Sequence, residues 1–158
     1  MRNPTDVTSQ SLGELPKHSS SSLIVVRIRS TTDTDAAAVV EELQAAHGIE
    51  SLDVVIANAG LSGFCPRIED AKVSDLQEYY HVDVIAVIVL FQAVLPLLVK
   101  SKAPRFVPMG SVAGTIGAME EVPIPNGVYG PVKAVLNWVT RKIHLEHEDL
   151  IAFPIHPG

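Results

Sequence analysis

Cysteine is almost absent from this chain, and so is any excess of basic residues. Cys65 is the only cysteine among the 158 residues. An intrachain disulfide is therefore excluded, which suits a reducing compartment and predicts a cytoplasmic protein. The formal net charge is −6 and no basic stripe is present, which argues against nucleic acid as a partner. Cys65 has no supporting motif for a nucleophile, and we interpret it as a plain loop or core thiol.

Long apolar runs are missing as well. Residues 1–22 are polar and rich in Ser and Pro, without a run that suits a signal peptide. They predict a flexible N-terminal arm ahead of a domain over residues 23–158. The most apolar stretch, Val84 to Val99, holds Gln92 and Pro96 and is shorter than the roughly 20 residues that span a bilayer. We therefore expect no membrane partner, and expect this helix to be buried on every side or to lie at an interface.

Short β-branched runs alternate with longer helical segments along the chain. Apolar residues make up 47% of the sequence, which suits one globular domain with a core. The alternation is typical of an α/β fold with a doubly wound parallel sheet. The predicted strands are Leu23–Ile28, Leu52–Ala57, Arg105–Met109 and Ile151–His156. The predicted helices are Thr34–Ala46, Ser74–Lys100 in two pieces, and Tyr129–His147.

Tyr129 and Lys133 form the most informative pattern, a Tyr-x-x-x-Lys spacing on a predicted helix. Residues four apart share a helix face, so phenol and ammonium would lie side by side. An ammonium favours the phenolate form of its neighbour, and such a phenol exchanges protons with a substrate oxygen. Ser111, 18 residues earlier, could hold that oxygen, as carbonyl–alcohol interconversion requires. Taken alone, the spacing is more often a solvated helix face, and Ser111 an ordinary loop serine.

The order of the motifs favours the catalytic interpretation. Along the chain come Asn58-Ala59-Gly60, then Gly110-Ser111, then Tyr129 with Lys133, and finally Pro157-Gly158. In this order the chain resembles the short-chain dehydrogenase/reductase family, from about residue 23 to residue 158. Within that family, Leu52–Ala59 and Leu90–Ala93 resemble the fungal norsolorinic acid ketoreductases of polyketide pathways.

The resemblance implies an oxidoreductase that uses NADP or NAD to interconvert a carbonyl and a secondary alcohol, without a metal. It implies a small-molecule substrate, in this subgroup a polycyclic polyketide. Tyr129 would be the acid/base, Ser111 would position the substrate oxygen, and Lys133 would tune Tyr129 and bind the nicotinamide ribose. The implied cofactor-binding residues are Asn58, Ala59, Gly60, Tyr129, Lys133, Pro157 and Gly158.

Three histidines and the first cofactor motif have simpler interpretations. Asn58-Ala59-Gly60 also suits an ordinary strand-to-loop turn. His156 suits a structural role as well as a cofactor contact. His144 and His147 share a predicted helix face, but no distant ligand set accompanies them, and we interpret them as part of a charged helix end.

The chain departs from the family pattern in two ways. Asp83 stands where the family has an Asn that bulges its helix and links Lys133 to solvent through a water; an Asp accepts from that water but cannot donate. The family's first strands and its Thr-Gly-x-x-x-Gly-x-Gly turn, which cradles pyrophosphate, have no counterpart in these 158 residues. Arg29 replaces the Asp that commonly contacts adenine. The expected fold is therefore an incomplete Rossmann-like sheet with an open edge, and nicotinamide cofactor is expected to bind weakly at most.

Two alternatives to an active enzyme follow from these departures. The chain is either a non-catalytic remnant that pairs through its two long helices, or a truncated gene model of an active reductase. In the family the corresponding helices build the dimer interface, so a homo-oligomer is expected. Residues Met119–Asn126 look inserted relative to simple reductases of the family. They would shape a pocket for a large polycyclic ligand, or form a passive loop extension.

Overall fold

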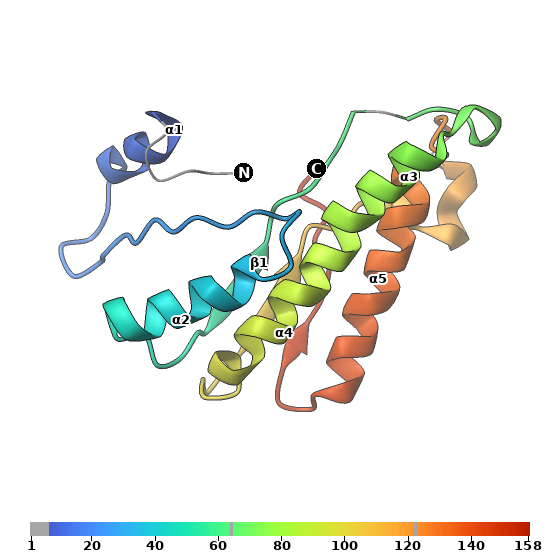
Figure 1. Ribbon diagram of the computed structural model, residues 1–158. Coiled ribbons are helices and arrows are strands. Elements are labelled where there is room, and N and C mark those ends of the chain that lie inside the picture. The colour runs from blue at the N-terminus through green and yellow to red at the C-terminus, as the bar shows by residue number, and fades with distance from the viewer. Residues whose placement is uncertain (1–6, 64, 122) are drawn as a thin grey trace.

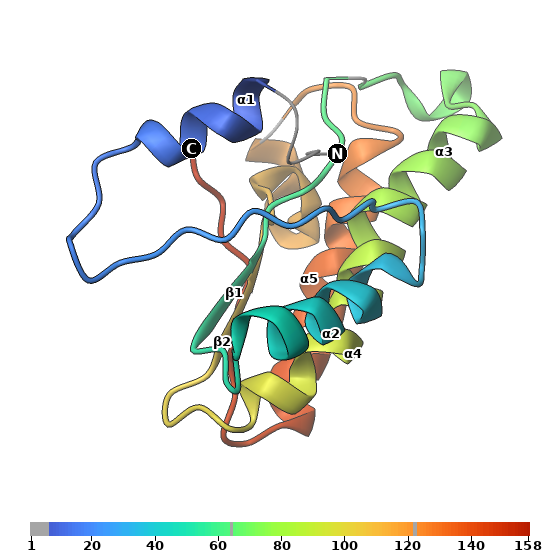
Figure 2. The ribbon, with the colours of Figure 1, turned by 60° about the vertical axis from the view of Figure 1, so that its left-hand side comes forward.

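The computed structural model of the chain describes residues 7–63, 65–121 and 123–158 and is built around a three-stranded parallel sheet (Figures 1 and 2). The strands lie in the order β1 (Val54–Ala57), β2 (Arg105–Pro108) and β3 (Ile151–Ala152). Phe106 of β2 lies opposite both Val55 and Ala152, and a bridge between Met109 and Ile155 extends the second pairing. Parallel strands joined through helices confirm the predicted α/β fold with an incomplete Rossmann-like sheet.

The helices occur close to where the sequence predicts them. They are α1 (Val7–Gln10), α2 (Asp35–His47), α3 (Val73–Tyr80), α4 (Ala86–Leu98) and α5 (Tyr129–Glu146), with 3₁₀ segments at Ser11–Glu14, Ile68–Asp70, Val112–Gly114 and Ile116–Glu121. Gly48 ends α2 in the left-handed conformation that glycine adopts without strain. A π-helical turn, His81–Ile85, joins α3 to α4, so the region predicted as two pieces is one continuous helical run.

The strand predicted over Leu23–Ile28 is wrong. This segment is irregular, and only Ile28 takes part in a bridge. A short β-branched run forms a strand only where a neighbouring strand pairs with it along its length, and the described part of the chain supplies none here. The predicted arm over residues 1–22 contains α1 and the 3₁₀ segment Ser11–Glu14; its first six residues lie outside the described residues.

Arg29 is bonded to the first turn of α2. Its Nε and Nη2 donate to the Asp35 carboxylate at 2.7 and 2.8 Å, and its backbone N–H donates at 3.0 Å. These hydrogen bonds from the Arg29 side chain hold the pKa of Asp35 below its ordinary value. Arg29, which replaces an acidic residue of the family pattern, therefore holds the segment before α2 against the first residue of that helix.

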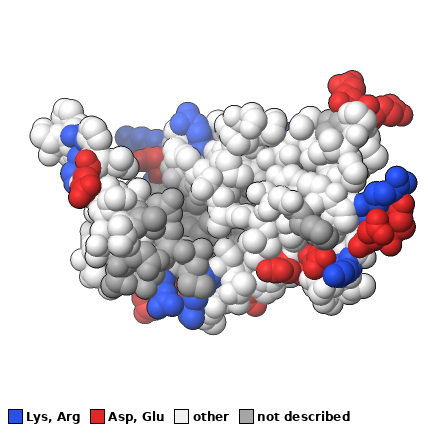
Figure 3. All heavy atoms as spheres, turned by 90° about the horizontal axis from the view of Figure 1, so that it is seen from above, with Lys and Arg blue, Asp and Glu red and all other residues white. Residues whose placement is uncertain are grey.

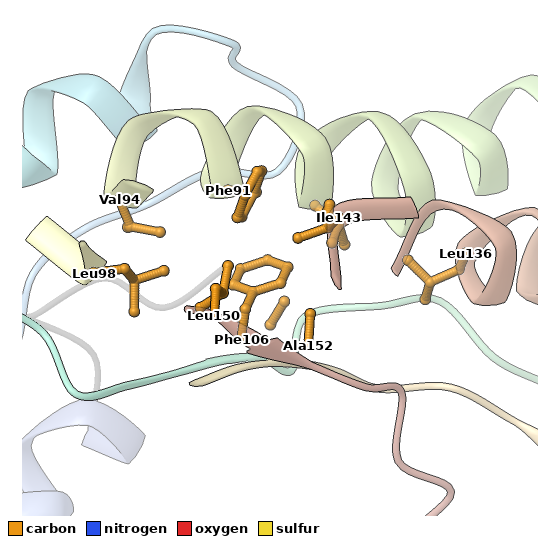
Figure 4. Packing of buried hydrophobic residues seen from close by; sticks show 10 residues of the cluster. Phe91, Val94, Leu98, Phe106, Leu136, Ile143, Leu150 and Ala152 are labelled. Carbon is orange, nitrogen blue, oxygen red and sulfur yellow. The ribbon is translucent and has the colours of Figure 1, made fainter. Parts of the chain in front are cut away.

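The core lies between the sheet and the helices α4 and α5 (Figure 4). Phe106 on β2 is fully buried and its ring meets that of Phe91 on α4 edge to face, with centroids 5.1 Å apart. Such aromatic pairs contribute about 0.5–1.5 kcal/mol beyond the area they bury. The other buried residues of this cluster are Ala57, Val87, Val94, Leu98, Leu136, Ile143, Leu150 and Ala152.

The continuous helical run Val73–Leu98 is longer than the apolar stretch noted in the sequence. At 26 residues and a mean hydropathy of 2.2, it is long and apolar enough to cross a membrane by length and composition alone. Phe91 of this run packs on the sheet, as in the core helix of an α/β domain. The expectation of a helix buried on every side is wrong, because Gln92 and Pro96 are exposed and 39% of its most apolar window is buried.

Helices α2, α4 and α5 cover one face of the sheet. In Figure 2, α2, α4 and α5 all lie on the same side of β1 and β2. Val55, Phe106 and Ala152 point toward them, because residues in register share a face. The opposite face carries large apolar side chains that are 40–57% exposed: Val54, Ile56, Ile151, Phe153 and Ile155.

Candidate active site

Lys133 lies in the second turn of α5 and is 4% exposed. Its Nζ donates to Oδ1 of Asp83 at 2.7 Å and to the backbone carbonyl of Met109 at 2.8 Å. A buried ammonium without such partners would carry a desolvation cost of several kcal/mol. The two bonds therefore fix the ammonium at the end of β2, which is where an open α/β sheet binds ligands.

Asp83 is the buried counter-ion of Lys133 and lies in the π-helical turn between α3 and α4. Its second oxygen, Oδ2, accepts a hydrogen bond from the backbone N–H of Leu61 at 3.0 Å. One carboxylate thus joins the loop after β1, the π turn and α5. Where the family pattern has an Asn acting through a water, this chain has a direct ion pair. π turns of this kind are frequent at functional sites.

Tyr129 is the first residue of α5 and is half-buried. The Nζ atom of Lys133 lies 5.4 Å from the centroid of the Tyr129 ring. This distance is within the range of a cation–π contact. The structure therefore places the two side chains on one helix face, as their spacing predicts.

Ser111 begins the 3₁₀ turn Val112–Gly114, which packs against the start of α5. The Ser111 Oγ accepts a hydrogen bond from the N–H of Ala113 at 3.2 Å. Because Oγ acts there as an acceptor, its own hydrogen is free to be donated to a substrate oxygen. Gly114 sits so close to α5 that a methyl group on it would lie 2.5 Å from the carbonyl carbon of Lys133. The Ser111 turn is thereby held against the helix turn that carries Lys133.

Two residues that position the site were not predicted from the sequence. The Asn126 Oδ1 accepts from the N–H of Gly130 at 2.7 Å, and its Nδ2 donates to the carbonyl of Ala113 at 3.5 Å. An Asn shortly before a predicted helix is a capping signal that could have revealed the first of these bonds. Met109 contributes a backbone carbonyl, for which a sequence offers no signal.

The predicted cofactor residues fall into two groups. Asn58, Ala59 and Gly60 form the exposed loop after β1, and a methyl group on Gly60 would lie 2.7 Å from the Asp83 Oδ1, so glycine is needed for this close approach. Pro157 and Gly158 are exposed, and no hydrogen bond among the described residues connects them to Tyr129 or Lys133.

The residues present fit the ribose end of a nicotinamide cofactor. An ammonium has three N–H donors, and Lys133 uses two of them on Asp83 and Met109. The third would remain for a ribose hydroxyl. The loop 58–60 lies at the same sheet end: Gly60 approaches the Asp83 carboxylate closely, and the N–H of the next residue, Leu61, donates to it.

A cavity of about 670 Å³ adjoins the two catalytic candidates. Its lining includes the residue that follows each of them, Val112 after Ser111 and Gly130 after Tyr129. The segment that looks inserted, 119–126, contributes Met119, Pro123, Ile124, Pro125 and Asn126; its Val122 lies outside the described residues. Figure 3 looks onto the end of the molecule where the strands finish, with most charged side chains toward the edges and uncharged ones between them.

The histidines near the end of α5 make structural contacts. The His144 Nδ1 is 3.0 Å from the carbonyl oxygen of Leu150, and the His147 ring packs edge to face on Phe91 at 5.5 Å. Among the residues that the structure describes, no three of the His, Cys, Asp and Glu side chains are grouped so that they could hold a metal ion. Cys65 is exposed in the loop after β1.

The amino-acid sequence is similar to that of characterised fungal reductases. The chain is 40% identical over 154 residues to norsolorinic acid ketoreductase of Dothistroma septosporum, covering 95% of this chain and 57% of that protein. It is 35% identical to norsolorinic acid ketoreductase of Aspergillus parasiticus, covering 100% of this chain and 59% of the relative. The chain thus spans less than two thirds of the length of these relatives.

A solved structure shares the fold over nearly the whole chain. The crystal structure of NADPH-bound carbonyl reductase from chicken fatty liver superposes with a TM-score of 0.87 at 26% identity, covering 99% of this chain and 66% of that chain. The family model described as short chain dehydrogenase matches residues 3–153, and so includes most of the segment expected to be an arm. The chain therefore belongs to the short-chain dehydrogenase family.

Proposed function

We propose that this chain carries the acid/base site of an NADP- or NAD-dependent oxidoreductase that reduces a ketone to a secondary alcohol. The observation that carries the proposal is the buried Lys133, held by Asp83 and the Met109 carbonyl beside the ring of Tyr129. An ammonium fixed next to a phenol, at the ligand-binding end of a parallel sheet, suits proton transfer to a substrate oxygen. The reductase names of the relatives agree with this chemistry.

In the proposed reaction the protein side chains orient the substrate oxygen and supply its proton. The nicotinamide cofactor, when bound, supplies hydride to the carbonyl carbon. Ser111 donates its hydroxyl hydrogen to the carbonyl oxygen and orients it. Tyr129 gives its phenolic proton to that oxygen as the C–O double bond becomes a single bond. Lys133 stabilises the phenolate left behind and donates to the ribose, while Asp83 fixes the ammonium in place.

Removing the phenolic hydroxyl is expected to abolish most turnover. In Tyr129→Phe, with NADPH in millimolar excess, the rate of ketone reduction should fall by about 100- to 10,000-fold, the usual contribution of a general acid. NADPH binding by calorimetry should change far less than turnover, because Lys133 and the loop 58–60 remain in place. Wild-type turnover in a correctly folded Tyr129→Phe protein would show that the proton comes from elsewhere.

For the substrate, we propose that the cavity beside Val112 and Gly130 holds the body of a polycyclic aromatic ketone. A volume of about 670 Å³ suits a drug-sized ligand. Ile116 and Met119 at this cavity are 74% and 62% exposed, and such exposed apolar groups are typical of ligand-binding surfaces. The relatives named for norsolorinic acid support a substrate of this class.

Filling the cavity should weaken binding of such a ligand. Ala134 on α5 lines the cavity, so Ala134→Leu is expected to raise the Kd of a soluble anthraquinone about tenfold, which equals about 1.4 kcal/mol. Calorimetry would measure it. Lys142→Leu, on the exposed end of the same helix, is the matched control and should leave the Kd unchanged. Equal affinities for all three proteins would place the ligand elsewhere.

We also propose that the chain forms a homo-oligomer through its long helices. A groove of about 570 Å³ runs between α3 and α5 and is lined mainly by apolar residues. Along α5, Trp138 and Leu145 are 66% and 60% exposed. Tryptophan is enriched at interfaces, where it carries much of the binding free energy.

A charge at this surface should separate the subunits. Trp138→Glu is expected to convert the oligomer to a monomer in light scattering coupled to size exclusion, because a buried carboxylate there would have no partner. Ile116→Glu, whose side chain is 74% exposed but lies at the other cavity, is the control and should keep the oligomer. A monomeric parent protein would contradict the proposal directly.

A further inference from the structure

The cavity beside Val112 and Gly130 is lined almost entirely by uncharged residues. Among the lining residues that the structure describes, only Arg67 and Glu69 carry a charge, and both lie in the segment between β1 and α3. In ligand pockets that are mainly apolar, a few polar groups fix the orientation of the ligand and provide specificity. Arg67 is the cation in this lining, so it is the group to which a negatively charged part of a ligand would be attracted.

The backbone at Arg67 is held against the loop that precedes α5. The N–H of Gly127 donates to the carbonyl of Pro66 at 2.7 Å, and the N–H of Asp70 donates to the carbonyl of Arg67 at 3.1 Å. A methyl group on Gly127 would lie 2.9 Å from the carbonyl carbon of Arg67 and 2.8 Å from the Cα of Ile68, so the two segments are in direct contact. These contacts fix the backbone from which the Arg67 side chain extends.

The guanidinium of Arg67 keeps most of its hydrogen-bond donors for a ligand. Its Nε donates to the Glu69 carboxylate, and both side chains are exposed. A guanidinium has five N–H donors, and across the described ranges the four on the two Nη atoms have no hydrogen-bond partner. An exposed ion pair of this kind adds little to stability, but it holds the plane of the guanidinium. The Nη edge can then donate two parallel hydrogen bonds to one carboxylate.

We propose that Arg67 is a specificity-determining residue, which binds a carboxylate substituent of the ketone substrate while the ketone itself lies at Ser111 and Tyr129. Because this role rests on the proposed function, it requires a ligand whose apolar body occupies the cavity. Hydrogen bonds from a guanidinium to an ionised carboxylate are stronger than those to a neutral group. The acid is therefore preferred over a neutral compound of the same size. The protein carries a net charge of −6, so this preference arises from the local contact and not from the charge of the whole molecule.

Two ligands of equal size test this role by binding, without any reference to turnover. The probes are anthraquinone-2-carboxylate and anthraquinone-2-carboxamide, which share one ring system and differ in charge. Calorimetry at pH 7 is expected to give a Kd about tenfold lower for the carboxylate than for the carboxamide. Arg67→Gln should remove this difference by raising the Kd of the carboxylate, and it should leave the Kd of the carboxamide unchanged. Arg67 is exposed, so the variant is expected to fold as the parent protein does.

Arg141→Gln is the matched control, because it removes the same charge from an exposed position on α5 that does not line the cavity. This variant should keep the tenfold preference for the carboxylate. Equal affinities of the parent protein for the two compounds, or a preference that survives Arg67→Gln, would overturn the role of Arg67 and leave the proposed substrate cavity standing. Failure of both compounds to bind the folded parent protein would overturn the substrate cavity, and the role of Arg67 with it.

Discussion

Replacing Lys133 with methionine is expected to lower the free energy of unfolding by about 3–5 kcal/mol, the usual cost of leaving one partner of a buried ion pair uncompensated. Asp83 is 1% exposed and would keep only the N–H of Leu61 as a partner. The carbonyl of Met109 would also lose its donor. Urea denaturation followed by circular dichroism measures the change.

The structure offers both a matched control and a test of mechanism for this effect. Lys142 lies on the same helix with an exposed ion pair to Glu146 at 3.0 Å, and Lys142→Met should cost about 0.3–0.5 kcal/mol. The double variant Asp83→Leu/Lys133→Met should be less destabilised than Lys133→Met alone, because it buries no unpaired charge. Equal effects of Lys133→Met and Lys142→Met would contradict the buried pair.

Gly114→Ala is expected to destabilise the protein by about 1–3 kcal/mol through overpacking. The added methyl group would lie 2.5 Å from the carbonyl carbon of Lys133 and 2.7 Å from the backbone nitrogen of Ala134. These are backbone atoms of α5, so they cannot move aside as a side chain would. The Ser111 turn must shift away from the helix, and the geometry of the site should loosen with it.

Gly117 is the matched control for this prediction, because it lies in the following 3₁₀ segment with nothing within 4 Å of the same methyl position. Gly117→Ala should be neutral or slightly stabilising. Urea denaturation of both variants distinguishes the steric effect of the added methyl group on the folded state from its effect on the backbone entropy of the unfolded chain. A Gly114→Ala protein as stable as Gly117→Ala would mean that the turn does not press on α5.

Much of the secondary structure was predictable from local pattern. The helix predicted at Thr34–Ala46 is found as α2, which ends at Gly48, and the Tyr129–Lys133 spacing predicted the shared face on α5, because these features depend on neighbours in the chain. The strand predicted at Leu23–Ile28 failed, because a strand exists only through pairing with another segment. The spacing and order of Ser111, Tyr129 and Lys133 were read from the sequence alone.

What only the tertiary structure decided is how those residues are held. Asp83 and Lys133 are 50 residues apart, and their contact arises because the π turn and α5 pack together at the end of the sheet. The carbonyl of Met109 and the N–H of Leu61 complete the site from two strand ends. Backbone groups are the same at every position, so a sequence cannot show which of them will meet a buried charge. The uncovered sheet face also depends on tertiary structure. The sequence shows that Ile56 and Phe153 are apolar, but only the packing of the helices decides which face of the sheet they cover.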